Sequence, residues 1–204
     1  MASVAHIDAP LTISSDEIED KLAPTMERLG IRKGLLQSLS GIKSRRFWER
    51  DTQPSDVATQ AAQLAMEKAG IQASQVGALI NTSVCRDYIE PSTACLVHGN
   101  LKLPDTCLNY DLGNACLGFM NGMDAAAQMI ENGAIAHALI VDGESSRYPI
   151  AQTIERLSDD ECTEMDFRSQ FATLTLGSGA AAMVLSRRTE GDNLPQYKGG
   201  VSCA

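Results

Sequence analysis

The 204-residue sequence has no apolar run near the roughly 18 residues that a membrane-spanning helix needs. Its first residues, Met1 to His6, lack the basic stretch and the apolar stretch of a secretory signal peptide. Basic residues are outnumbered by acidic ones, 17 to 26, and a formal net charge of −9 disfavours a nucleic-acid partner. These absences lead us to expect a cytoplasmic protein with no membrane span.

The sequence also lacks the paired cysteines of a structural metal site. Its six cysteines include no C-x-x-C pair and no zinc spacing, so no metal is expected, and a reducing compartment suits them best. Histidine is scarce as well: His6, His98 and His137 are each expected to be structural or solvent-facing. What the sequence does have is 44% hydrophobic residues, enough for a sizeable core.

Segments with strand and helix patterns alternate along the chain and predict an α/β fold with a mixed or mainly parallel sheet. We expect Ser55 to cap the second helix, Pro91 to lie in the first turn of the third, and the polar stretch 144–170 to form a long excursion or a lid. The predicted strands cover 4–7, 76–82, 106–112, 138–142, 171–176 and 180–186, and the predicted helices cover 14–29, 55–69, 91–101 and 116–132.

Cys116 stands where the predicted strand 106–112 turns into the predicted helix 116–132. The first turn of a helix offers unpaired N–H groups and a positive dipole end. That field stabilises a thiolate, and the same N–H groups can hold the oxyanion of an acylated sulfur. Chemistry alone leaves two readings open: a nucleophile, or a buried structural cysteine at a helix start.

The residues around Cys116 resemble the nucleophile motif of the thiolase-fold condensing enzymes, in particular the ketoacyl-acyl-carrier-protein synthase III group. Four segments carry the resemblance, in order and at compatible spacing over about residues 30–188: Gly41-Ile-Lys-Ser-Arg-Arg46, Asn81-Thr-Ser with Glu90-Pro-Ser-Thr-Ala94, Asn114-Ala-Cys-Leu-Gly-Phe119, and Leu176-Gly-Ser-Gly-Ala180. The resemblance implies a thiolase-like α-β-α-β-α sandwich and an acyltransferase that works through an acyl-Cys116 intermediate.

Glu90 departs from the pattern of the ordinary synthases, which commonly carry Phe before that proline. It lies 26 residues before Cys116 (116 − 90 = 26). A glutamate at this place resembles the OleA-type thiolases, where it reaches into the partner subunit of a homodimer and acts as a base. A condensation without decarboxylation must remove an α-proton, which a positioned carboxylate can do. The alternative is a solvated loop carboxylate beside a helix start.

The resemblance covers one half of a duplicated fold. It implies that residues 1–190 form an N-terminal thiolase-like half and that 191–204 lead toward a second half. The family's His and Asn, which stabilise the oxyanion and the carbanion, come from that second half. Gly118 and Gly122 allow close backbone approach, and the resemblance places their helix at the buried centre, against its pseudo-symmetric mate. We therefore expect an apolar exposed surface, dimerisation, and no condensation by this chain alone.

The acyl donor stays open between coenzyme A and an acyl carrier protein, with no permanently bound cofactor expected. Synthases that use coenzyme A often carry a Trp six residues before the Gly-Ile pair, where this chain has Leu35; its single Trp is Trp48. Arg45 and Arg46 are candidates for phosphate contact, or simply a solvated basic pair.

Three hypotheses follow. The first is an OleA-like condensing enzyme, the second a decarboxylating 3-oxoacyl-[acyl-carrier-protein] synthase III of fatty acid biosynthesis, and the third a non-catalytic half-domain or scaffold subunit. Glu90 separates the first from the second.

Overall fold

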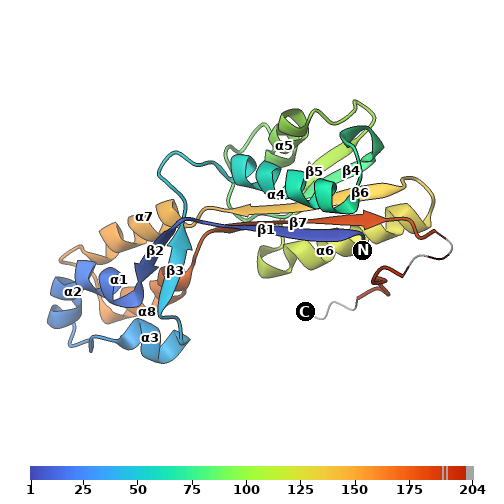
Figure 1. The fold of residues 1–204 in the computed structure, drawn as a ribbon. Coiled ribbons are helices and arrows are strands. Elements are labelled where there is room, and N and C mark those ends of the chain that lie inside the picture. Colours follow the sequence, from blue (N-terminus) through green and yellow to red (C-terminus); the bar gives the residue numbers. More distant parts are fainter. Residues whose placement is uncertain (190, 192, 201–204) are drawn as a thin grey trace. The chain divides into compact units, whose positions relative to one another are not determined.

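The computed structural model describes residues 1–189, 191 and 193–200, and these form two compact units (Figure 1). Unit 1 contains Met1–Ile7, Thr52–Glu144 and the segment from Ala180 onward. Unit 2 contains Asp8–Asp51 and Ser145–Gly179. Each unit is assembled from segments far apart in the sequence.

Unit 1 is built on a five-stranded sheet with the strand order β1-β7-β6-β4-β5. The central strand β4 (Ala78–Asn81) pairs in parallel with β5 (Leu108–Asp111) and with β6 (His137–Glu144). The end of β7 (Gly179–Ser186) lies beside the start of β6, so β7 runs in the opposite direction. With β1 (Ser3–Asp8) at the edge, this is the α/β fold with a mixed sheet that the sequence predicts.

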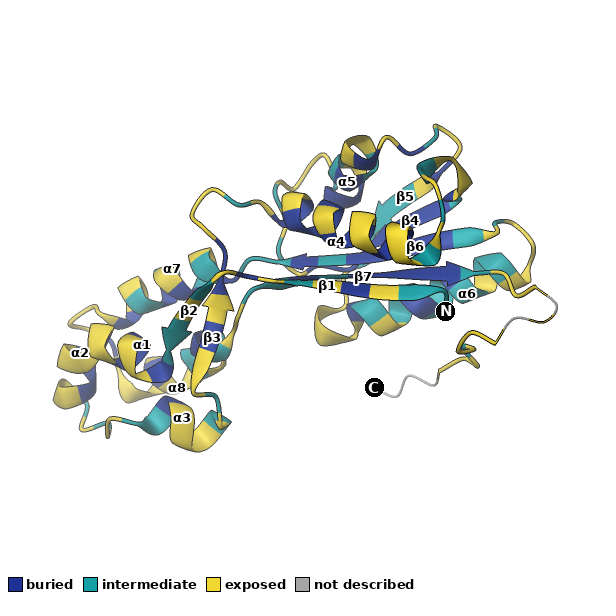
Figure 2. Ribbon diagram, in the orientation of Figure 1, coloured by how far each residue is buried: buried dark blue, intermediate teal, exposed yellow. Residues whose placement is uncertain are grey.

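Helices cover both faces of this sheet (Figure 1). α4 (Pro54–Ala69) and α5 (Thr93–Leu101) lie on one face, and α6 (Gly118–Glu131) lies on the other. Successive strand residues point to opposite faces, so Ile80 and Ile140 join the core under α6. β4 is therefore buried along its whole length, and β6 and β7 are buried over most of theirs, which Figure 2 shows in dark blue.

Gly118 and Gly122 hold α6 against its own sheet. A Cβ on Gly118 would lie 2.9 Å from the carbonyl oxygen of Thr82, and one on Gly122 would lie 2.9 Å from Thr82 Cγ2 and 3.2 Å from Ile140 Cγ2. The predicted close approach is thus confirmed, and in this chain the glycines approach β4 and β6 of the same unit. The packing of α6 against a pseudo-symmetric mate from a second half stays a prediction.

Unit 2 packs five helices around a small core beside an antiparallel pair, β2 (Leu11–Ser14) and β3 (Ser44–Phe47). The helices are α1 (Ser15–Lys21), α2 (Ala23–Arg28), α3 (Leu35–Ser40), α7 (Arg147–Leu157) and α8 (Glu164–Gln170). The core is formed by Ile18, Leu22, Met26, Leu36, Leu157, Cys162, Phe167 and Leu174.

No helix was predicted in the polar stretch 144–170, the expected excursion or lid, but this stretch forms α7 and α8. The predicted strand 171–176 is wrong, since Phe171–Thr175 is a 3-10 turn. Each of these elements contributes few apolar residues, Leu157, Phe167 and Leu174 among them, and buries them in one shared core. Because these apolar residues are few and widely spaced in an acidic segment, the sequence shows no clear helical periodicity there.

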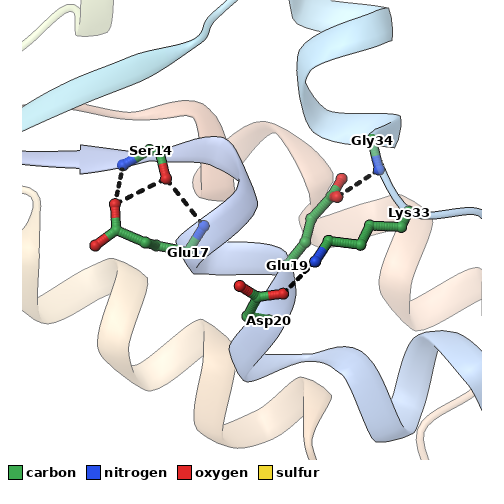
Figure 3. Close-up of polar contacts among 6 residues, drawn as sticks. All are labelled: Ser14, Glu17, Glu19, Asp20, Lys33 and Gly34. Carbon is green, nitrogen blue, oxygen red and sulfur yellow. Dashed lines mark hydrogen bonds and ion pairs between the residues drawn. The ribbon is translucent and has the colours of Figure 1, made fainter.

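Side chains define the start of α1 and the entry to α3 (Figure 3). The Ser14 hydroxyl accepts the backbone N–H of Glu17 while the Glu17 carboxylate accepts the N–H of Ser14, a reciprocal capping box. The buried Glu19 carboxylate accepts the N–H groups of Gly34, at 2.5 Å, and Leu36, at 2.7 Å. Lys33 forms an ion pair with Asp20 at the exposed side. A single helix over 14–29 was expected, but it breaks at Leu22, just before Pro24.

Two predicted helix starts shift by one or two residues. α4 is capped by Gln53 together with Asp56, with Pro54 at its first position, so Ser55 is not the cap. α5 begins at Thr93 with Ser92 as its cap, and Pro91 lies outside the helix. Among the described residues, no helix is both long and apolar enough to cross a bilayer.

Candidate active site

The two predicted catalytic residues follow neighbouring strands of unit 1. Glu90 lies in the loop after β4, and Cys116 lies in the turn after β5. β4 and β5 are adjacent and parallel, so both connections leave the same edge of the sheet, where α/β folds place their sites. The two connections also lie close together, since the Arg86 Nη2 atom is 3.5 Å from the position that a Cβ on Gly113 would take.

Cys116 is the middle residue of a 3-10 turn, Ala115–Leu117, that leads directly into α6. Its side chain is exposed. Ala115 has a φ of 44°, a left-handed conformation that is strained for a residue with a Cβ. Asn114 supports the turn, since its carbonyl accepts the Leu117 N–H at 3.0 Å and its amide donates to Asn121 Oδ1 at 2.6 Å. The predicted strand-to-helix turn is confirmed, although α6 itself begins two residues after Cys116.

The outer face of α6 is open in this chain. Gly118, Gly122, Met123 and Ala126 are its buried residues. Leu117, just before the helix, is 52% exposed, and Met120 is 48% exposed. A largely buried helix after Cys116 was expected, and this is wrong for the described residues, because α6 packs its inner face on the sheet and its other faces meet little beyond Tyr197, which donates a hydrogen bond to Asp124.

Glu90 is exposed near the end of its loop and is joined to Pro91 by a cis peptide bond. The neighbouring large side chains are exposed as well: Val84 is 61%, Tyr88 59% and Ile89 88% accessible. The loop therefore presents one carboxylate among apolar side chains at the sheet edge that also carries Cys116.

Asp142 is a titratable group at this edge that sequence reasoning missed. It lies near the end of β6, and its Oδ2 accepts a hydrogen bond from Thr82 Oγ1 at 3.3 Å. Burial raises the pKa of Asp142 to about 6, with a further contribution from the nearby Glu144 carboxylate. An acidic residue directly after the apolar run 138–141 was the available signal.

The arginine pair belongs to unit 2, on β3. Arg45 is buried, donates from Nη2 to Ser15 Oγ at 3.0 Å, and leaves Nε and Nη1 without a hydrogen-bond partner. Burial lowers its pKa. Arg46 is exposed and donates to the Ala9 carbonyl at 3.1 Å. Of the two, only Arg46 presents its guanidinium to solvent, and the predicted phosphate contact stays a prediction.

The histidines do not supply a catalytic partner for Cys116 at this edge. His98 lies in α5 with Nε2 3.2 Å from the Pro104 carbonyl oxygen. His137 begins β6, with Nδ1 2.8 Å from Ser186 Oγ, and burial and then Arg187 lower its pKa. His6 lies exposed on β1. Within the described residues, no cluster of His, Cys, Asp and Glu is suited to a metal ion.

A family profile described as 3-Oxoacyl-[acyl-carrier-protein (ACP)] synthase III matches residues 110–198, the segment that contains Cys116, α6, β6 and β7. The acyl-CoA:acyl-CoA alkyltransferase of Xanthomonas campestris is 52% identical over 202 residues, which cover 99% of this chain and 60% of that protein. The Shewanella oneidensis protein of the same name is 40% identical over 90% of this chain and 52% of its own length.

A solved structure agrees with the sequence comparison. Xanthomonas campestris OleA with bound lauric acid and lauroyl-CoA has a TM-score of 0.94 and 51% identity over 98% of this chain and 60% of its own. The chain belongs to the synthase III group of thiolase-fold condensing enzymes. The resemblance seen in the four sequence segments, including its OleA-type character, is thereby confirmed. The present chain spans about 60% of the length of the Xanthomonas alkyltransferase.

Proposed function

We propose that this chain carries the nucleophile and the base of an acyltransferase that joins two acyl-CoA molecules by a non-decarboxylative Claisen condensation. The Cys116 thiolate attacks the first thioester carbonyl, the bond to the coenzyme A sulfur breaks, and coenzyme A leaves as its thiol after taking up a proton. We assign the stabilisation of the oxyanion in this step to the backbone N–H of Cys116.

In the second half-reaction, the Glu90 carboxylate removes an α-proton from the second acyl thioester. The resulting carbanion attacks the carbonyl of acyl-Cys116. A carbon–carbon bond forms, the bond to the Cys116 sulfur breaks, and the thiolate is restored with a β-ketoacyl product. We propose, as in the family resemblance, that Glu90 acts in the site of a partner subunit in a homodimer.

The observation that carries this proposal is the 52% identity of this chain to an acyl-CoA:acyl-CoA alkyltransferase, together with the exposure of both Cys116 and Glu90 on connections that follow neighbouring strands. Solved variants of the Xanthomonas relative substitute a glutamate and a cysteine with the same separation as Glu90 and Cys116. Other variants substitute a histidine that lies further beyond its cysteine than Ala204 lies beyond Cys116.

The position of that histidine supports an enzyme whose catalytic residues come from two halves of the fold. We propose that residues 1–190 form the N-terminal half of the enzyme and that 191–204 connect it to a half that supplies His and Asn; positions 190, 192 and 201–204 lie outside the described residues. We further propose a cytoplasmic location, which suits the cysteine spacing of the sequence.

The second candidate is a decarboxylating synthase III, which is favoured by the family profile and by a Lactiplantibacillus plantarum synthase III that is 31% identical over 74% of this chain and 42% of its own length. Such an enzyme would accept a malonyl group from an acyl carrier protein and would need no base at position 90. A non-catalytic scaffold is the third, and it requires that Cys116 stay unacylated.

Acylation tests the nucleophile. Incubation of the complete gene product with lauroyl-CoA, followed by digestion and mass spectrometry, should place one lauroyl group on Cys116. Cys116→Ser should abolish thioester formation and reduce turnover at least a thousandfold, because the hydroxyl has no activating base here. Cys95→Ser is the matched control at another exposed cysteine and should leave both unchanged. A label on Cys95, or turnover by Cys116→Ser, would reject the assignment.

Glu90→Gln separates the two enzymatic candidates. The variant keeps the size of the side chain and loses the base, so acylation should proceed normally while condensation of two lauroyl-CoA molecules falls about 100- to 10,000-fold. The product is measured by gas chromatography after hydrolysis and decarboxylation to the ketone. Normal condensation by Glu90→Gln, or a strict requirement for a malonyl donor, would establish the decarboxylating synthase instead.

A further inference from the structure

The tip of the loop that carries Glu90 is closed by a side-chain hydrogen bond. Thr93 Oγ1 donates to Asp87 Oδ2 at 3.2 Å. Asp87 lies three residues before Glu90, and Thr93 lies three residues after it. Glu90 is therefore the middle residue of a short ring, 87–93, which the hydrogen bond between Thr93 and Asp87 closes. Thr93 is fully buried and Asp87 is half-buried, so this closing bond is partly shielded from water.

Asp87 also fastens this ring to the helix layer. Its carboxylate accepts the Ser55 hydroxyl at 2.7 Å and the Ser55 backbone N–H at 3.2–3.3 Å, both in the first turn of α4. A carboxylate at a helix N-terminus is favoured by the unpaired N–H groups and by the helix dipole. One side chain thus ties the loop to α4 and closes it on α5.

Two more carboxylates fix the segments on either side. Glu144 accepts the N–H groups of Val84 at 2.6 Å and Cys85 at 3.1 Å. Asp111 accepts the N–H of Thr93 at 3.2 Å and that of Ala94 at 2.8 Å. Residues 88–91 are left between these anchors, and all four are exposed. The only titratable carboxylate among them is Glu90.

We infer that Asp87 is a positioning residue, which sets the place of Glu90 through its bonds to Thr93 and Ser55; the inference rests on the function proposed above. A base must be held close to its productive geometry, and a displacement of about 1 Å can cost roughly a hundredfold in rate. Asp87 and Thr93 do not touch the reacting atoms. Their role is to restrict the conformations of residues 88–91, so that the Glu90 carboxylate stays in one position.

Thr93 offers a matched pair of variants for the test. Thr93→Val keeps the shape of the buried side chain and removes the hydroxyl that closes the ring, whereas Thr93→Ser keeps the hydroxyl. Ser55→Ala is a second variant on an independent element, and it removes the 2.7 Å bond to Asp87. None of the three changes Cys116, Glu90 or a backbone anchor.

The first measurement is amide hydrogen exchange on the 204-residue chain, which requires no catalysis. Exchange over residues 87–92 should be at least tenfold faster in Thr93→Val than in the wild type, with Thr93→Ser near the wild type and Ser55→Ala in between. Equal exchange in the Val and Ser variants would overturn the inference.

The second measurement is catalysis by the complete gene product. Thr93→Val should lower the kcat of condensation about ten- to hundredfold while the rate of Cys116 acylation and the KM for lauroyl-CoA stay unchanged, and Thr93→Ser should restore kcat. A merely structural defect would lower acylation as well, and unchanged condensation in Thr93→Val would likewise overturn the inference. A wild type that acylates but never condenses would reject the proposed function instead, and the exchange result would still decide the role of Asp87.

Discussion

At the scale of single residues, the sheet end that carries Glu90 and Cys116 holds two residues whose conformation or charge is unfavourable. Ala115 holds a left-handed conformation worth about 1–3 kcal/mol of strain, directly before Cys116, the proposed nucleophile. Asp142 keeps a carboxyl group in a mostly buried position beside Glu144, where the charged form is disfavoured. Both lie at the strand ends that carry the proposed chemistry, where strained and perturbed groups tend to gather.

Asp142→Asn should stabilise the chain in a pH-dependent way. The pKa of Asp142 is raised in the folded state from 3.8 to about 6, so its ionisation favours the unfolded state. The destabilisation is absent below pH 4, grows as the pH rises toward 6, and is constant above it. Asn should therefore add about 2 kcal/mol to the free energy of unfolding at pH 8 and almost nothing at pH 3.5. Urea unfolding of both proteins across this range measures it, and a pH-independent difference would contradict the assigned pKa.

At the scale of elements, the position of α6 depends on two residues without side chains, Gly118 and Gly122. Two glycines on one helical face let it approach β4 and β6 to a distance at which any side chain would collide with Thr82. The helix thereby carries its start, and Cys116 with it, to the end of β5. Glycine weakens a helix by about 1 kcal/mol relative to alanine, so this closeness has a cost in helix stability.

Gly122→Ala and Gly99→Ala should have opposite effects. A Cβ at Gly122 meets two methyl groups at 2.9 and 3.2 Å, and the resulting overpacking, about 1–3 kcal/mol, outweighs the gain in helix propensity. Gly99, in α5, has no neighbour within 4 Å, so alanine there should stabilise the chain by about 0.5–1 kcal/mol. Thermal and urea unfolding of the two variants provide the comparison. A stabilising Gly122→Ala would show that α6 lies further from the sheet.

At the scale of the whole molecule, the chain exposes apolar side chains next to its proposed site. Tyr88 and Ile89 on the loop, and Leu117 and Met120 at the start of α6, are each about half exposed or more. The chain spans about 60% of the length of its Xanthomonas relative. Exposed apolar groups of this size gathered at one sheet edge indicate a surface that is covered in the working protein.

The 204-residue chain should self-associate and should not condense acyl thioesters by itself. Sedimentation should show an average mass that rises with concentration, because association removes these apolar side chains from water. Ile89→Asp should shift the association to at least tenfold higher concentration. Leu64→Asp, on the outer surface of α4, is the matched control and should leave it unchanged. A wild-type monomer at high concentration that turns over lauroyl-CoA would contradict both expectations.

Local sequence was sufficient for the elements whose signals are themselves local. The strands β1, β4, β5, β6 and β7 and the helices α4, α5 and α6 were all predicted within a few residues, because apolar runs, caps and glycines act over one or two turns. The same reading placed Cys116 at a strand-to-helix turn, and the motif around it identified the family. The helix break at Pro24 was also available locally and was missed.

The tertiary structure decided what depends on residues distant in the chain. Helices α7 and α8 exist because Leu157 and Phe167 meet Ile18 and Leu22, more than 130 residues away, in one core that no local window contains. The parallel pairing of β4 with β5 placed Glu90 and Cys116 at the same end of the sheet. The packing of α4 beside α5 allows Asp87 to bind Ser55 as well as its near neighbour Thr93. The sequence by itself thus determined which groups are proposed to react, since the chemistry of a thiol or a carboxylate is a property of the single residue. Only the fold determined their support, since hydrogen bonds and burial are properties of pairs.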